Sequence, residues 1–230
     1  TRQGGDVFFH DVIDTGVDWN HEDLAANIWR NTKEIPGDGR DNDQNGYIDD
    51  VVGWDFVDTT PYSIPQEDYQ NEDNNPSDYF GHGTHVAGII GATMNNAKGI
   101  VGICPDCKIM ALRAGYAPGG LEYVDIAQAL VYAADNGADV MNMSFGGPFG
   151  DPIEKAAIDY ALSKNVILIA AAGNNSSNQL FYPAAYENII SVTATNIQDQ
   201  KASFSNYGYW TDVAAPGATI LSTVPASGYY

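Results

Sequence analysis

Residues 81–90 read Gly-His-Gly-Thr-His-Val-Ala-Gly-Ile-Ile, with a histidine between two glycines ahead of small and apolar residues. The glycines on both sides of His82 let other chain segments approach it closely, because they carry no side chain. The small and apolar residues that follow predict a buried helix over residues 82–94. A histidine that begins such a helix can face a cleft, although Gly-His-Gly alone is more typical of a capping or core histidine.

A carboxylate near the start of the chain gives a second signal, in the stretch Ile13-Asp14-Thr15-Gly16-Val17-Asp18. Asp14 comes at the C-terminal end of an apolar strand that is predicted over residues 7–13. Sites of open α/β sheets form just outside such strand ends. Taken alone, Asp14 and Gly16 would indicate only a turn.

Short apolar segments alternate with helical patterns along the chain, which predicts βαβ units around a parallel sheet. Their apolarity is continuous, as expected for strands that are covered on both faces. Further strands are predicted over residues 108–113, 138–144, 166–172 and 189–195. One helix is predicted over residues 121–136, and another begins at Asp151, where Glu154 can close a capping box.

Residues 31–78 do not follow this alternation, because they are rich in Asp, Asn, Gly and Pro and show little helical period. We expect a loop-rich acidic insertion with short strands here, rather than a second domain. A chain of 230 residues has the size of one large domain, so residues 1–230 are expected to belong to a single domain.

The formal net charge of −20 comes from 30 acidic and 10 basic residues. A nucleic-acid-binding protein would carry a basic surface instead, so we expect no nucleic-acid partner. No apolar run approaches the length that spans a bilayer, so no membrane partner is expected either. The excess of acidic residues favours a monomer and permits binding sites for metal cations.

Together, the stretches around Asp14 and His82 closely resemble the subtilisin family of serine proteases. Further stretches match family motifs in the same order along almost the whole chain, at residues 140–147, 170–174, 204–208 and 212–217. Several specific motifs in the correct order make a chance agreement negligible. The resemblance implies an α/β, three-layer subtilisin-like fold, in which helices flank a mostly parallel central sheet.

The resemblance also implies an activity, that of a serine endopeptidase acting on extended segments of protein or peptide substrates. His82 would take the proton of a serine, and Asp14 would hold the imidazole and stabilise its cation. Asn174 would donate its side-chain amide to the oxyanion. Small residues in the substrate pocket predict room for a large apolar side chain. The substrate-binding residues would be Ser144, Phe145, Gly146, Ala171, Ala172, Gly173, Gly119 and Gly120.

The family's nucleophile lies in a Gly-Thr-Ser-Met-Ala motif, which this sequence does not contain. By resemblance, we expect the serine beyond Tyr230, so the chain is expected to be an inactive fragment that lacks the C-terminal part of the fold. Ser222 and Ser227 lie outside such a motif and are not expected to replace it. At the other end, His10 and Asp11 interrupt the apolar strand that relatives have before the aspartate.

Two stretches of oxygen-bearing side chains predict structural calcium sites. Residues 41–50 place carboxylates and amides at alternating positions around Gly46, like the first part of an EF-hand loop. Such hard ligands favour calcium over zinc, although an acidic hairpin without a metal shows the same pattern. A second site rests on the resemblance alone, which assigns Asp23 and Asn96 as ligands. The ligands predicted in the first site are Asp41, Asp43, Asn45, Asp49 and the carbonyl of Tyr47.

Cys104 and Cys107 form a Cys-x-x-Cys pair just before a predicted strand. Zinc would need two further ligands, and a thioredoxin-like pair should begin a helix. A local disulfide or two packed thiols is therefore the expected state of this pair.

Two other functions are compatible with parts of the pattern. A noncatalytic protease-like module that binds calcium or peptides would not need the missing serine. A nucleotide-binding α/β domain would use Gly81 and Gly83, but the complete Gly-x-Gly-x-x-Gly fingerprint is absent. Intact Asp14, His82 and Asn174 favour the enzyme. The resemblance further implies secretion, with or without a propeptide, although no signal peptide is visible.

Overall fold

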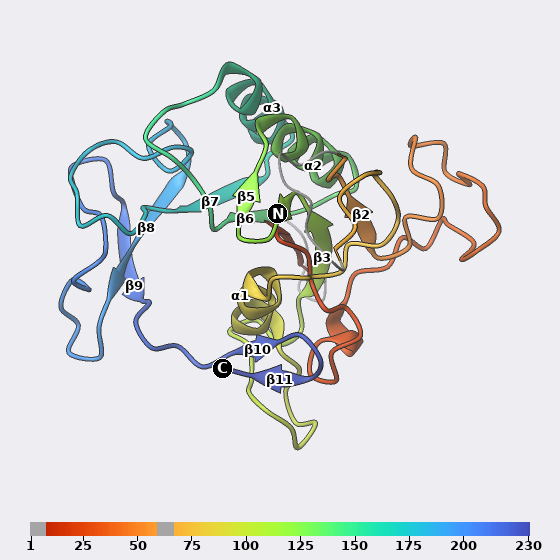
Figure 1. The fold of residues 1–230 in the computed structure, drawn as a ribbon, viewed down its shortest axis with the longest axis horizontal. Coiled ribbons are helices and arrows are strands. Elements are labelled where there is room, and N and C mark those ends of the chain that lie inside the picture. The colour runs from red at the N-terminus through yellow and green to blue at the C-terminus, as the bar shows by residue number, and fades with distance from the viewer. Residues whose placement is uncertain (1–7, 59–66) are drawn as a thin grey trace.

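The computed structural model describes residues 8–58 and 67–230 of the chain (Figure 1). Val7, where the sequence predicts the first strand to begin, and residues 59–66 of the predicted insertion lie outside the described residues. None of the helices in the described part is long and apolar enough to cross a membrane.

A seven-stranded sheet forms the centre of the described structure, and every pair of neighbouring strands in it runs parallel. The strand order is β2-β3-β1-β6-β7-β8-β9. This sheet confirms the predicted α/β class, and the predicted strands are all present. The strands are β1 (Phe9–Asp14), β2 (Gly53–Asp55), β3 (Lys108–Arg113), β6 (Val140–Met143), β7 (Ile167–Ala171), β8 (Ile190–Thr195) and β9 (Val213–Pro216).

Helices cover the two faces of this sheet, which gives the three layers seen in Figure 1. α1 (His82–Gly91) packs on one face against β1 and β3, while α2 (Tyr123–Asp135) packs on the opposite face against the same strands. α3 (Pro152–Ser163) lies beside α2. Successive side chains of β1 enter the two apolar cores, with Ile13 on the α2 side and Val12 on the α1 side.

Three small elements complete the described structure. β4 (Gly115–Tyr116) pairs with β5 (Gly120–Leu121) in one antiparallel hairpin, and β10 (Thr223–Val224) pairs with β11 (Gly228–Tyr229) in another. A short 3-10 helix, η1 (Ala25–Asn27), precedes the predicted insertion. The β10-β11 hairpin brings the end of the chain against α1 (Figure 1).

The small residues of α1 let it lie buried between the sheet and this hairpin. A Cβ atom added to Gly88 would lie 2.2 Å from Oγ1 of Thr223, so the close contact requires glycine. The hydroxyl of Thr223 donates to the carbonyl oxygen of Thr84, at 2.7 Å. Ser222 is fully buried and donates to the carbonyl oxygen of His85, also at 2.7 Å. The Ser222 hydroxyl is thereby committed to the backbone of α1.

His10 and Asp11 do not interrupt β1, because both residues pair in register with the strands on either side. Asp11 is fully buried and stands level with Met110 and Met141, and its two carboxylate oxygens have no hydrogen-bond partner in the described structure. Burial raises the pKa of this carboxyl well above its ordinary value, and the nearby Val12 amide offsets the rise only in part. The centre of the sheet therefore contains a destabilising group.

Asp151 begins α3 as its N-cap. Its carboxylate accepts hydrogen bonds from the amides of Ile153 at 2.7 Å and Glu154 at 3.3 Å. The predicted capping box is wrong, because the Asp151 amide donates to the hydroxyl of Tyr186 instead. Glu154 turns into the protein, where only 1% of its surface is exposed.

Cys104 and Cys107 are disulfide-bonded, with their Cα atoms 5.4 Å apart. The pair closes a short loop directly ahead of β3. Of the two states that the sequence leaves open, the structure has the disulfide.

Candidate active site

Asp14 and His82 meet at the carboxyl end of β1. Asp14 is the last residue of that strand, and His82 is the first residue of α1. The Nδ1 atom of His82 lies 2.7 Å from Oδ1 and 2.9 Å from Oδ2 of Asp14. The Asp14 side chain is 3% exposed, whereas that of His82 is 47% exposed, so the pair is anchored inside and open at the imidazole.

The contact also fixes the chemistry of the imidazole. Its hydrogen bond with Asp14 raises the pKa of His82 above the ordinary value, against the opposing effect of burial. Because Nδ1 faces the carboxylate, Nε2 is the ring nitrogen left for a reacting group. The arrangement suits a general base that is oriented by a buried acid.

Two glycines permit this close approach of helix and strand. A Cβ atom on Gly83 would lie 2.0 Å from the carbonyl oxygen of Gly16, so a larger residue would push α1 away from the turn after Asp14. Gly16 itself has a φ of +102°, and its Cβ position lies 2.5 Å from the carbonyl oxygen of Ser77. As predicted, a glycine beside His82 lets another chain segment approach closely: Gly83 makes room for the turn that contains Gly16.

Asp78 holds the start of α1 in place, and sequence reasoning missed it. Its Oδ1 atom accepts from the Gly81 amide at 2.7 Å, the Phe80 amide at 2.9 Å and the Thr15 hydroxyl at 2.9 Å. Its Oδ2 atom accepts from the amide and hydroxyl of Thr84. One buried carboxylate thus ties the turn after β1 to the first turn of α1. Asp78 lies three residues before Gly81, the N-cap of α1, so a capping pattern does not reveal it.

A cavity of about 190 Å³ lies in front of the Asp14–His82 pair. Its walls bring together predicted catalytic and substrate-binding residues from β1, α1, the β4-β5 hairpin and the end of β6. Phe80 also lines it and was not predicted. Gly120 is absent from these walls and pairs with Tyr116 in the hairpin. The predicted residues around the cavity are Asp14, His82, Gly119, Ser144 and Phe145.

The predicted oxyanion segment follows β7, two strands away from β1 in the sheet. Ala171 lines a neighbouring cavity of about 270 Å³ together with Ser144, whereas Ala172 is buried. Asn174 is exposed beyond the end of β7. The structure therefore places Asn174 at the same edge of the sheet as the pair, without a direct contact between them among the described hydrogen bonds.

Asn206 fixes the loop that carries Asn174. Its side-chain nitrogen donates to the carbonyl oxygen of Ala172 at 2.8 Å, and its side-chain oxygen accepts from the amides of Asn175 at 2.9 Å and Ser177 at 3.1 Å. Asn206 is 2% exposed, so this anchor is inside the protein. Its stretch matches a family motif, but sequence reasoning gave it no role.

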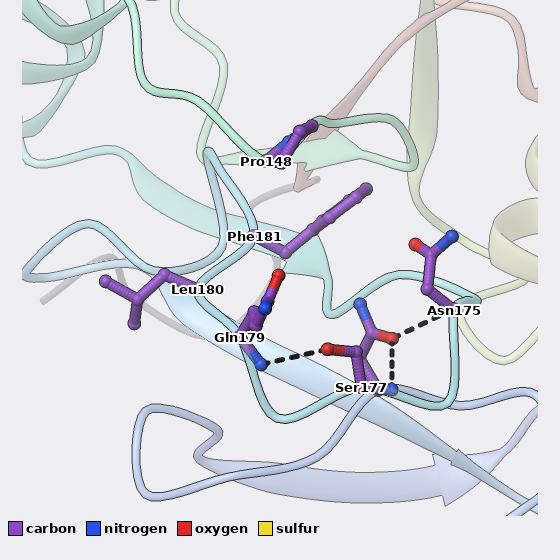
Figure 2. A pocket seen from close by; sticks show the side chains of 7 residues that line it. Pro148, Asn175, Ser177, Gln179, Leu180 and Phe181 are labelled. Carbon is purple, nitrogen blue, oxygen red and sulfur yellow. Dashed lines mark hydrogen bonds between the residues drawn. The ribbon is translucent and has the colours of Figure 1, made fainter.

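Phe181 takes up space between two predicted substrate-binding segments. A Cβ atom on Gly146 would lie 2.6 Å from the Phe181 ring, and one on Gly173 would lie 3.0 Å from it. Figure 2 shows Phe181 beside Pro148, at the edge of a cavity of about 270 Å³. The Phe181 ring therefore lies against two of the segments that the sequence predicts to line the substrate pocket. No motif signals this residue.

The first predicted calcium loop gathers a carboxylate that was not predicted. Oxygen atoms of Glu34, Asp41 and Asp43 lie within 4.8 Å of one another, a separation that one cation can bridge. Asp49 turns away and accepts from two backbone amides, those of Gly37 and Gly39. Carboxylate oxygens are suitable ligands for calcium, so this donor set fits the ion.

Three of the remaining predicted ligands, Asn45, Asp23 and Asn96, make hydrogen bonds within the chain. The Asn45 side-chain oxygen accepts from the Tyr47 amide at 2.8 Å. In the second predicted site, Asp23 is fully buried and accepts from the Asn96 side-chain nitrogen at 2.5 Å and from the Ile100 amide at 3.0 Å. Asn96 thus presents its nitrogen, not its oxygen, to Asp23. These hydrogen bonds tie each loop together.

Comparison with known proteins adds independent findings. A family model described as the subtilase family matches residues 11–230. The chain is 42% identical over 218 residues to a thermophilic serine proteinase of Bacillus sp. strain AK1, and 39% identical over 218 residues to thermitase of Thermoactinomyces vulgaris. It is 34% identical over 222 residues to subtilisin DY of Bacillus licheniformis. Each match covers 95% of this chain but only 46%, 66% and 67% of the respective relative.

Proposed function

Since this chain belongs to the subtilase family, we propose that it provides the aspartate and the histidine of a serine endopeptidase. The serine would come from outside residues 1–230, because these residues contain no Gly-Thr-Ser-Met-Ala motif. The observation that carries the proposal is the 2.7 Å contact between the buried Asp14 carboxylate and Nδ1 of the open His82 imidazole.

His82 would act first as a base. Its Nε2 atom takes the proton of the serine hydroxyl while the serine oxygen bonds to the carbonyl carbon of the substrate. Asp14 accepts the Nδ1 hydrogen bond, holds the ring in the required tautomer and stabilises the imidazolium that forms. The imidazolium then returns its proton to the leaving amine, and a water molecule releases the acyl group through the same base.

The remaining site residues would bind the substrate and its transition state. Asn174 would donate to the oxyanion, because it follows β7 at the edge of the sheet where the pair lies. The backbone of Ser144, Phe145 and Gly146 would pair with an extended peptide, with Gly119 opposite. Phe181 favours a small side chain before the cut, since its ring narrows the pocket between Gly146 and Gly173.

Calcium would stabilise the fold rather than take part in the reaction. Glu34, Asp41 and Asp43 would hold it, because their oxygens converge and three carboxylates so close together repel one another without a cation. For the whole protein we further propose secretion, a monomeric state and protein or peptide substrates.

Hydrolysis by the full-length protein tests the proposal. Casein and chromogenic peptides should be cleaved by the wild type, and His82→Ala should reduce the rate by a factor of about 10⁴ or more. His85→Ala provides a matched control, because that histidine lies on the same helix but bonds to the carbonyl of Ile220. A folded protein that cleaves nothing would instead support a noncatalytic binding module.

A further inference from the structure

A second cavity adjoins the one in front of the Asp14–His82 pair. It has a volume of about 160 Å³ and shares Gly119, Leu121 and Phe145 with the first cavity. A peptide bound at the pair can therefore place another side chain in this second cavity, because an extended chain advances about 3.3 Å per residue.

Glu154 is one of the residues that line the second cavity. It is 1% exposed, and its Oε2 atom has no hydrogen-bond partner in the described structure. Apart from Glu154 and the hydroxyls of Tyr123 and Tyr182, the lining consists of glycines and apolar side chains such as that of Ile126. A buried carboxylate oxygen without a donor is costly, so the cavity has an unmet requirement for a donor.

Within the described residues, no lysine or arginine side chain donates a hydrogen bond to Oε2 of Glu154. Lys155 is the next residue along α3. Its Nζ atom lies 2.5 Å from Oδ1 of Asp159 and 5.7 Å from the centre of the Tyr186 ring. Burial and then the nearby Asp151 charge raise the pKa of Glu154 to about 7, although the Tyr186 hydroxyl opposes the rise. A cation placed in the cavity would favour the ionised carboxylate and donate to Oε2.

We propose that Glu154 makes the second cavity a subsite for a basic side chain of the substrate, that of arginine or lysine. Such a side chain supplies both the missing donor and the opposite charge. An apolar side chain would leave Oε2 without a partner, and an acidic one would meet a like charge. The net charge of −20 also favours the approach of basic peptides. The proposal rests on the proposed protease function for the position of the substrate.

The test compares three versions of the full-length protein: wild type, Glu154→Gln and Asp159→Asn. Glu154→Gln keeps the shape but removes the charge. Asp159→Asn removes one charge from the exposed side of the same helix and serves as the matched control. The substrates are a peptide library in which the residue before the cut is fixed. Each of the remaining positions is varied in turn among arginine, leucine, glutamine and glutamate. Thermal unfolding shows whether each variant folds, and Glu154→Leu provides a second variant if Glu154→Gln does not.

At one of the varied peptide positions, wild type and Asp159→Asn should cleave the arginine peptide with a kcat/KM at least about 10-fold higher than that of the leucine peptide. Glu154→Gln should abolish this preference, and Glu154→Leu should reverse it. A preference for apolar side chains at every position in the wild type, or an arginine preference that survives in Glu154→Gln, would overturn the proposal.

Binding separates a failure of this proposal from a failure of the protease function. If no peptide is cleaved, the same arginine and leucine peptides are titrated by calorimetry. If the arginine peptides bind the wild type about 10-fold more tightly than they bind the Glu154→Gln variant, this result supports the subsite even without hydrolysis. Equal binding to both proteins would contradict it.

Discussion

Nδ1 of His82 lies 2.7 Å from Oδ1 of Asp14, although the two residues are 68 positions apart in the chain. The contact joins the end of β1 to the start of α1 and leaves the imidazole half exposed above a cavity. This relationship makes the strongest predictions about the activity of the complete protein.

Asp14→Asn in the full-length protein should lower kcat by a factor of about 10⁴. The pKa of His82 is raised by its bond to Asp14, so kcat/KM of the wild type should fall as the pH drops through a value above the ordinary histidine pKa of about 6.5. The variant should show this inflection at lower pH. Asp18→Asn is the matched control, because Asp18 lies in the same turn and its carboxylate accepts from the amides of Asn20 and Ala226 instead. An unchanged rate or inflection would contradict the role of Asp14.

Asp78→Ala should destabilise the protein by about 3 kcal/mol and reduce kcat, because it leaves three backbone amides and two hydroxyls without their acceptor. Urea unfolding gives the free-energy difference, and peptide hydrolysis gives the rate. Asp78→Asn keeps one acceptor oxygen and should lie between the wild type and the alanine variant. If Asp78→Ala unfolds within about 0.5 kcal/mol of the wild type, the carboxylate does not hold the start of α1.

Phe181→Gly should enlarge the pocket between Gly146 and Gly173. Peptides with phenylalanine or leucine before the cut should gain in kcat/KM relative to alanine peptides, by about 10-fold or more. Leu180→Gly is the control, because Leu180 lines the adjoining cavity and is not among the atoms nearest to either glycine. A wild type that already prefers large apolar residues, with no change in Phe181→Gly, would show that the ring does not limit the pocket.

Asp11→Val should raise the free energy of unfolding at pH 7 by about 2 kcal/mol, because it removes a buried carboxyl without a partner. The folded-state pKa of Asp11 is raised, so the folded protein keeps a proton that the unfolded chain releases above its own pKa of about 3.9. The wild type therefore loses stability as the pH rises from about 4 toward neutrality, and this loss should be smaller in Asp11→Val. Asp11→Asn remains polar and should gain less. Parallel stability–pH curves for Asp11→Val and wild type would contradict the assignment.

Calcium should raise the melting temperature, and a chelator should lower it. At calcium concentrations 100 times the dissociation constant, binding stabilises the folded state by about 2.7 kcal/mol. Asp43→Asn should reduce this shift, because it weakens the group formed with Glu34 and Asp41. Asp38→Asn is the control, since Asp38 is exposed in the same loop and outside that group. An equal calcium response in both variants, or none in the wild type, would exclude this site.

The sequence predicts the fold class and the Asp14–His82 pair because these features are local. Continuous apolar runs mark buried strands, and a carboxylate at a strand end and a histidine at a helix start meet at one edge of a parallel sheet. The edge strands are less evident: the sequence predicts short strands within residues 31–78 without locating β2, which has three residues, and it does not predict β9, which is largely exposed. The end of α1 was placed at Met94, but Ala92 already leaves the helical conformation.

The other site residues depend on contacts between distant segments. Asp78 acts through Thr15 and Thr84, and Phe181 acts through Gly146 and Gly173, so neither has a local signature. Glu154 matches a capping-box pattern, yet the hydroxyl of Tyr186, 32 positions later, takes the amide that the box would need. This contact joins the loop after β7 to the start of α3, and Glu154 is buried.

Labelling of the full-length protein with a fluorophosphonate tests the central claim most directly, when mass spectrometry locates the labelled residue. We predict a label on one serine outside residues 1–230 that disappears in His82→Ala and persists in His85→Ala. The folded protein is loaded with calcium and freed of any propeptide before the reaction. No label under these conditions, or a label that His82→Ala leaves unchanged, would contradict a nucleophile that depends on the Asp14–His82 pair.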